Sequence, residues 1–68
     1  MIATPQVLNL ARFHVADNAT TETSARACLA DAVKLFDDGL YDWARIRALR
    51  SLSFSVGMHS PVYARAAR

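Results

Sequence analysis

The side chains that could carry out chemistry in this 68-residue chain are two histidines, one cysteine and a few carboxylates. His14 and His59 are far apart in the sequence, and neither has a carboxylate at the spacing expected of a metal ligand. Asp37 and Asp38 are adjacent, so on a helix they would point about 100° apart and would not converge on one substrate. We therefore expect no metal site and no cofactor.

Cys28 and Ser60 are the candidate nucleophiles. No base accompanies Cys28 at a recognisable spacing, which favours a role as a small core residue. His59 precedes Ser60 without a third member of a triad, and the following Pro61 indicates that Ser60 caps a helix. A single cysteine also excludes an internal disulfide. The sequence predicts a protein that is not an enzyme and has no catalytic residue.

A different set of side chains is better suited to binding. Trp43, Arg47, Arg50 and Phe54 are spaced i, i+4, i+7 and i+11, which places them on one face of a helix beside Ile46. We call these five residues the Trp43 stripe. Aromatic side chains and arginines are the usual anchors of protein interfaces. The stripe predicts an interaction surface for a second copy of the chain, with a dimer as the first expectation, or for a larger protein.

The Trp43 stripe also allows two alternative roles. The first or last segment of the chain could cover it, which would make it part of the core. Alternatively, arginines can hold phosphates and a tryptophan can stack on a base, as in a nucleic-acid-binding accessory protein. The residues expected to bind nucleic acid in that case are Arg45, Arg47, Arg50, Arg65 and Arg68.

The charge distribution is uneven along the chain. Residues 1–42 carry three basic and six acidic side chains, a net charge of −3, whereas residues 43–68 carry five arginines and no acid, a net charge of +5. This asymmetry is consistent with a nucleic-acid-binding surface, and equally with an acidic helix that packs against a basic one.

These side chains need helices to position them. The pattern of caps and apolar residues predicts one all-α domain spanning residues 1–68, a small helical bundle organised on a central antiparallel hairpin with short N- and C-terminal helices. Thr4 and Ser60 each precede a proline, the arrangement of a cap followed by the first helical residue. Gly39 suits the left-handed position that ends a helix. The expected helices are at about residues 5–16, 21–38, 41–56 and 61–67.

The first helix has poor periodicity, so a docked extended arm is its alternative. The second helix should begin with Thr20 or Thr21 as its cap. Its buried stripe is expected to contain Ala25, Cys28, Leu29, Ala32, Leu35 and Phe36. The third helix should pack against it through Tyr41, Ala44, Ala48, Leu52 and Ser55, flanked by Leu49 and Val56.

Composition also bears on the location of the protein. The chain is 53% hydrophobic, yet it has no unbroken run of about 18 apolar residues, so we expect no membrane span. Its first residues lack the basic segment and the apolar run of a secretory signal. The expected location is the cytoplasm.

The hairpin resembles two known helical families over residues 25–55. The run from Gly39 to Ala44 is similar to the inter-helix turn of tetratricopeptide repeats, and Ala32 and Ser51 fall where that family has small residues. The same helices are similar to the helix pair of HEPN domains, some of which are ribonucleases that use an arginine and a histidine. Arg50 and His59 are the nearest such pair here, at a longer spacing. Both resemblances imply a helical hairpin.

Overall fold

The computed structural model describes residues 3–17 and 23–68 of the chain, and these residues form four helices and no strand. The predictions of an all-α class and a central hairpin are confirmed. Thr20 and Thr21, the expected caps of the second helix, lie outside the described residues. The helices are α1 (Thr4–Asp17), α2 (Thr23–Asp37), α3 (Tyr41–Val56) and α4 (Pro61–Ala67).

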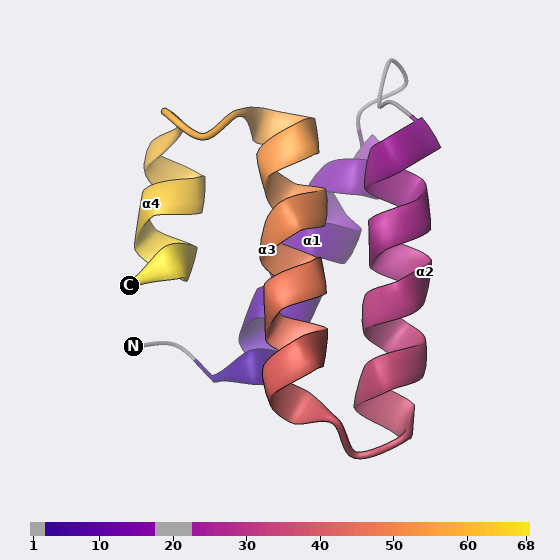
Figure 1. The fold of residues 1–68 in the computed structure, drawn as a ribbon. Coiled ribbons are helices and arrows are strands. Elements are labelled where there is room, and N and C mark those ends of the chain that lie inside the picture. The colour runs from indigo at the N-terminus through magenta and orange to yellow at the C-terminus, as the bar shows by residue number, and fades with distance from the viewer. Residues whose placement is uncertain (1–2, 18–22) are drawn as a thin grey trace.

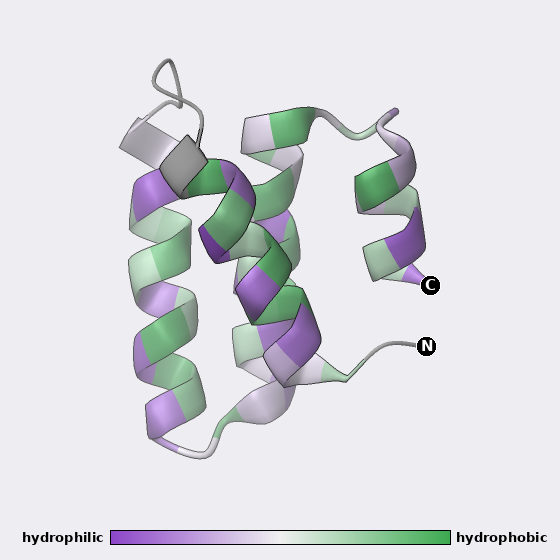
Figure 2. Cartoon of the chain, turned by 180° about the vertical axis from the view of Figure 1, so that it is seen from behind, coloured by the Kyte–Doolittle hydropathy of each residue, from purple (hydrophilic) through white to green (hydrophobic). Residues whose placement is uncertain are grey.

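Helix α3 is the central element of the structure. It packs against α2 on one side and α4 on the other, and α1 lies behind the α2–α3 pair (Figure 1). Seen from the opposite side, α1 crosses in front of the hairpin (Figure 2). The molecule spans 30 × 24 × 14 Å, and a helix with its side chains is about 10–12 Å across. The fold is therefore a thin two-layer arrangement in which α1 covers one face of α3.

The interior is built from small side chains. Among the residues whose burial the structure describes, six alanines are fully buried, and the largest fully buried side chains are Leu52, Val7 and Ser51. Leu29, Val33, Phe36 and Leu49 are partly buried and pack around this centre. Small residues allow neighbouring helices to approach closely, so the helices meet with little space between them for a large side chain. The fully buried alanines are Ala11, Ala25, Ala32, Ala44, Ala48 and Ala66.

Ser51 joins the two helices of the hairpin directly. Its hydroxyl is fully buried and donates a 2.7 Å hydrogen bond to the backbone carbonyl of Ala25. A buried hydroxyl without a partner would cost free energy, so this bond satisfies the one polar side chain that the described core contains. A larger side chain at residue 51 would collide with the backbone of α2.

The turn between α2 and α3 is tight and is held by backbone hydrogen bonds. Gly39 has a φ of 83°, its N–H donates to the carbonyl of Phe36, and the N–H of Leu40 donates to that of Leu35. These two bonds form a Schellman motif, the usual way to close a helix with a left-handed glycine. The carbonyl of Leu40 then accepts the first bond of α3, from Ala44.

The two ends of the chain dock in different ways. The segment 4–17 is helical, so the alternative of an extended arm is excluded. Its expected cap was wrong by one residue, because the carbonyl of Ala3 accepts from Val7 and places Thr4 inside the first turn. The side chain of Gln6 accepts from the N–H of Ala3 instead. At α4, the predicted cap is confirmed, since the Ser60 hydroxyl accepts from the N–H of Val62.

The predicted inner stripe of α3 is buried in its middle and more exposed at its ends. Ala44, Ala48 and Leu52 are buried as expected, but Tyr41 is 54% exposed. It lies at the first residue of the helix, beside the turn, and its ring contacts that of Phe36 on α2 at a centroid distance of 5.0 Å, so it packs against the preceding helix as predicted although it is not buried. Ser55 donates to the carbonyl of His14, so this end of the stripe also contacts α1, which was not predicted. The sequence periodicity could not distinguish which helix would cover each part of this stripe.

Ser51 provides a test of the close approach between α2 and α3. We expect Ser51→Ala to lower the free energy of unfolding by about 0.5–1.5 kcal/mol, because it removes the bond to Ala25. Ser51→Leu should cost more, about 1–3 kcal/mol, because the added methylenes overpack the helix crossing. Urea unfolding followed by circular dichroism would measure both. Ser53→Ala, which removes only a bond within α3, should change stability little. Equal effects at residues 51 and 53 would contradict the role given to Ser51.

Candidate protein-interaction surface

The Trp43 stripe lies on the face of α3 that α1 does not cover. Trp43 is 60% exposed, Ile46 is 50% exposed and Phe54 is 45% exposed. Arg50 is exposed and Arg47 is half-buried. The described residues therefore do not cover the stripe, and its assignment to the core is wrong for its three apolar members. The structure brings all five stripe residues onto one helix face over about three turns.

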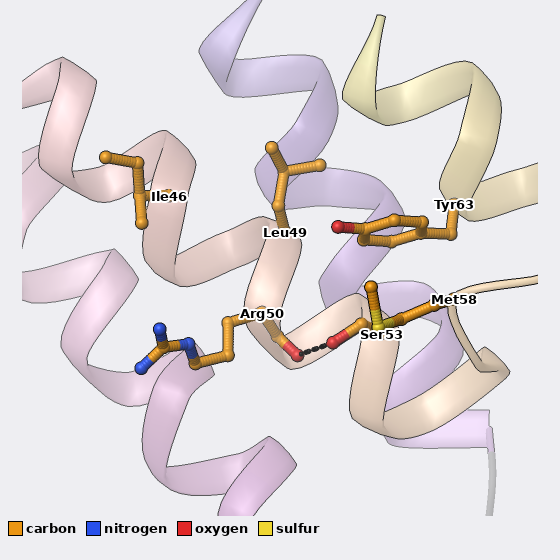
Figure 3. Close-up of a pocket in the computed structure, with 6 residues that line it drawn as sticks. All are labelled: Ile46, Leu49, Arg50, Ser53, Met58 and Tyr63. Atoms are coloured by element: carbon orange, nitrogen blue, oxygen red, sulfur yellow. Dashed lines mark hydrogen bonds between the residues drawn. The ribbon is translucent and has the colours of Figure 1, made fainter.

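A shallow pocket adjoins the stripe between α3 and α4. It has a volume of about 390 Å³ and is lined partly by the stripe residues Ile46 and Arg50. Tyr63 reaches from α4 towards Leu49, while the side chains of Ile46 and Arg50 lie on the side away from Tyr63 (Figure 3). Met58, in the α3–α4 connection, is 68% exposed at its rim. The pocket extends the apolar surface of the stripe towards α4.

The small side chains between the helices explain why the large apolar side chains of α3 lie at the surface. Around Ser51 the α2–α3 seam is lined by buried alanines and a serine, which leave little room there for an indole or a phenyl ring; the rings of Phe36 and Tyr41 meet only beside the turn. At about 100° per residue, Trp43 and Phe54 lie roughly 120–140° around α3 from Ala48, on the side that faces solvent. Large apolar side chains that remain in water on one face are typical of a surface that another molecule covers.

Arg45 has a structural role that the sequence did not indicate. Its guanidinium donates to the carbonyl of Ala66 at 3.1 Å and to that of Arg68 at 3.3 Å. These carbonyls lie at the C-terminal end of α4, where backbone acceptors have no partner within the helix and the helix dipole is negative. Arg45 therefore ties α4 to α3.

The five arginines proposed for nucleic acid do not form one continuous group. Arg47 and Arg50 lie on the outer face of α3, whereas Arg45 is directed to the end of α4. Arg65 lines a different pocket, between α1 and α4, together with Leu10 and His14. Nucleic-acid binding stays a prediction, with Arg47 and Arg50 as the pair that the structure places next to the aromatic residues.

The remaining side chains considered for chemistry are dispersed. His14 is on α1 and His59 is exposed in the connection before α4, while Cys28 is half-buried on α2. Asp37 and Asp38 are both exposed where α2 ends. Among residues 3–17 and 23–68, no three histidine, cysteine or acidic side chains are grouped as metal ligands would be. In the same ranges, no helix combines the length and apolar character needed to cross a lipid bilayer.

Sequence reasoning missed two parts of this surface. Met58 and Tyr63 lie in separate elements, and only the packing of α4 brings them to the stripe. The bond from Arg45 to α4 joins residues 21 positions apart, which no periodicity indicates. Comparison of the chain with models of protein families, with curated proteins and with solved structures found no match.

The role of Arg45 can be tested through the order of α4. A seven-residue helix is too short to be stable alone. We expect Arg45→Met to lower the protection of the α4 amides against hydrogen exchange, while the amides of α2 stay protected. Two-dimensional NMR would resolve the two sets of amides. Arg26→Met, at an exposed residue of α2, is the matched control and should leave α4 unchanged. Unaltered exchange in α4 of the Arg45 variant would contradict the capping role.

Proposed function

We propose that the protein is a small non-enzymatic interaction module that self-associates through the Trp43 stripe. The observation that supports this most is the inversion of side-chain size across α3. Three of the four buried side chains on the side of α3 towards α1 and α2 are alanine or serine, with Leu52 the exception, while Trp43, Ile46 and Phe54 are exposed on the other side. The exposed side chains follow one another along one helix face, as the anchors of an interface do.

The energetics favour association of moderate strength. Full burial of a large apolar side chain contributes about 1.5–3 kcal/mol, and these three are about half buried already, so each has roughly 1 kcal/mol left to gain. Two copies would double that gain. Association must also offset several kcal/mol of lost translational and rotational freedom. We therefore expect a reversible complex that depends on protein concentration.

The arginines in the stripe are compatible with this function. Arg50 is exposed beside Ile46, and its guanidinium can pair with a carboxylate or stack on an aromatic ring. Arginine is also one of the residues enriched at the centre of protein interfaces. The stripe thus combines apolar area with groups that give an interface its orientation.

Trp43 provides the direct test. Sedimentation velocity or light scattering over a wide concentration series should give a mass that rises above that of one chain, and Trp43→Ala should return the mass to that of one chain. Because Trp43 is 60% exposed, its replacement should lower the free energy of unfolding by only about 1 kcal/mol. Circular dichroism would confirm that the helices persist.

Phe13→Ala is the matched control for this experiment. Phe13 is also an exposed aromatic residue, at 64%, but it lies on α1. Its replacement should leave the association unchanged. A wild-type protein that remains a single chain at every concentration would overturn the proposed self-association. Unfolding of the Trp43 variant would show that the indole belongs to the core.

A further inference from the structure

The exposed face of α3 carries opposite charges placed symmetrically about Ile46. Asp42 lies four residues before Ile46 and Arg50 lies four residues after it, so the three residues share one side of the helix. All three are exposed. Trp43 and the partly buried Leu49 lie three residues before and after Ile46, about 60° to either side of it. The face thus has an apolar centre, an acid at one end and a base at the other.

We propose that a second copy of the chain docks antiparallel on this face, with Ile46 at the two-fold axis and Asp42 of each copy opposite Arg50 of the other. This inference rests on the proposed self-association and specifies its geometry. The two-fold axis passes through Ile46 and is perpendicular to α3. A residue a given number of positions before Ile46 in one copy is therefore opposite the residue the same number of positions after Ile46 in the other copy. With a rise of about 1.5 Å per residue, Asp42 and Arg50 are each about 6 Å from the axis along the helix.

Charge decides between this arrangement and the obvious alternative. An antiparallel pair that placed Trp43 opposite Phe54 would have its axis between Ala48 and Leu49. Arg47 and Arg50 would then flank the axis in both copies, bringing four guanidinium groups together. Like charges that face each other across an interface oppose association. The axis at Ile46 places an apolar residue at the centre and opposes an acid to a base at two equivalent positions.

Trp43 and the α3–α4 pocket are also used in this arrangement. Trp43, three residues before Ile46, lies opposite Leu49 of the other copy, so its ring adds apolar contact on the side of the interface away from the Asp42–Arg50 pair. Ile46, Leu49 and Arg50 line the pocket, so a second helix over Ile46 covers one side of it. Arg47 lies about 100° around the helix from Ile46, at the edge of the covered surface.

Charge reversal tests the proposed pairing. In Asp42→Arg, a dimer would have arginine opposite arginine at both contacts, and in Arg50→Asp it would have aspartate opposite aspartate. Each variant alone should associate about tenfold more weakly than the wild type, or worse. An equimolar mixture of the two should recover association, because both contacts then oppose an acid to a base. Sedimentation velocity of each variant and of the mixture would measure this.

The controls distinguish a failure of the Ile46-centred geometry from a failure of the proposed self-association. Asp31→Arg makes the same charge change at an exposed residue of α2 and should associate as the wild type does. Each variant must keep the circular dichroism spectrum of the wild type. If Asp42→Arg loses it, Asp42→Lys is used in its place, and if Arg50→Asp loses it, Arg50→Glu is used. If the mixture fails to recover association while Trp43→Ala still abolishes it in the wild-type background, the Ile46-centred geometry is overturned and the proposed function stands. A wild-type protein that stays monomeric would overturn both the Ile46-centred geometry and the proposed self-association.

Discussion

The close approach of α2 to α3 at Ser51 is the contact on which the rest of the structure depends. A hydroxyl at residue 51 is small enough to lie against the backbone of α2 and polar enough to bond the carbonyl of Ala25. The neighbouring buried alanines allow the same spacing along the helices. This seam gives α3 a fixed position, and α1 and α4 then pack against different sides of the same helix.

A seam of small residues determines where the large ones lie. A chain of this length buries only about 60% of the surface that its unfolded form exposes, and here the fully buried side chains are mostly alanine. The tryptophan and the phenylalanine of α3 consequently remain on the open side, next to arginines. The feature that makes the hairpin compact therefore also leaves the apolar surface for which we propose a partner. The small side chains of the α2–α3 seam thus bear on both the stability of the fold and its proposed interaction surface.

Much of this architecture could be predicted from local sequence signals. Gly39 and the Ser60–Pro61 pair marked real helix ends because their backbone requirements are local. The Trp43 stripe followed from helical periodicity, and its exposure depended only on which face the alanines took. The bond of Ser55 to α1 was not predicted, because periodicity gives an angle around a helix and does not say which neighbour lies there. The roles of Arg45 and Tyr63 depend on the docking of α4, which is a tertiary event.

The turn at Leu40 has a consequence for how the molecule folds. Leu40 closes the end of α2 with its N–H and begins α3 with its carbonyl, so one residue of the three-residue connection 38–40 is bonded to both helices. Unwinding the end of one helix therefore disturbs the start of the other, and we expect the hairpin to open as one cooperative unit. Neighbouring helices joined by a short turn also close a small loop, which limits the entropy lost when they pack. We therefore expect the hairpin to form early in folding and α4 to dock later, through the bonds that Arg45 donates.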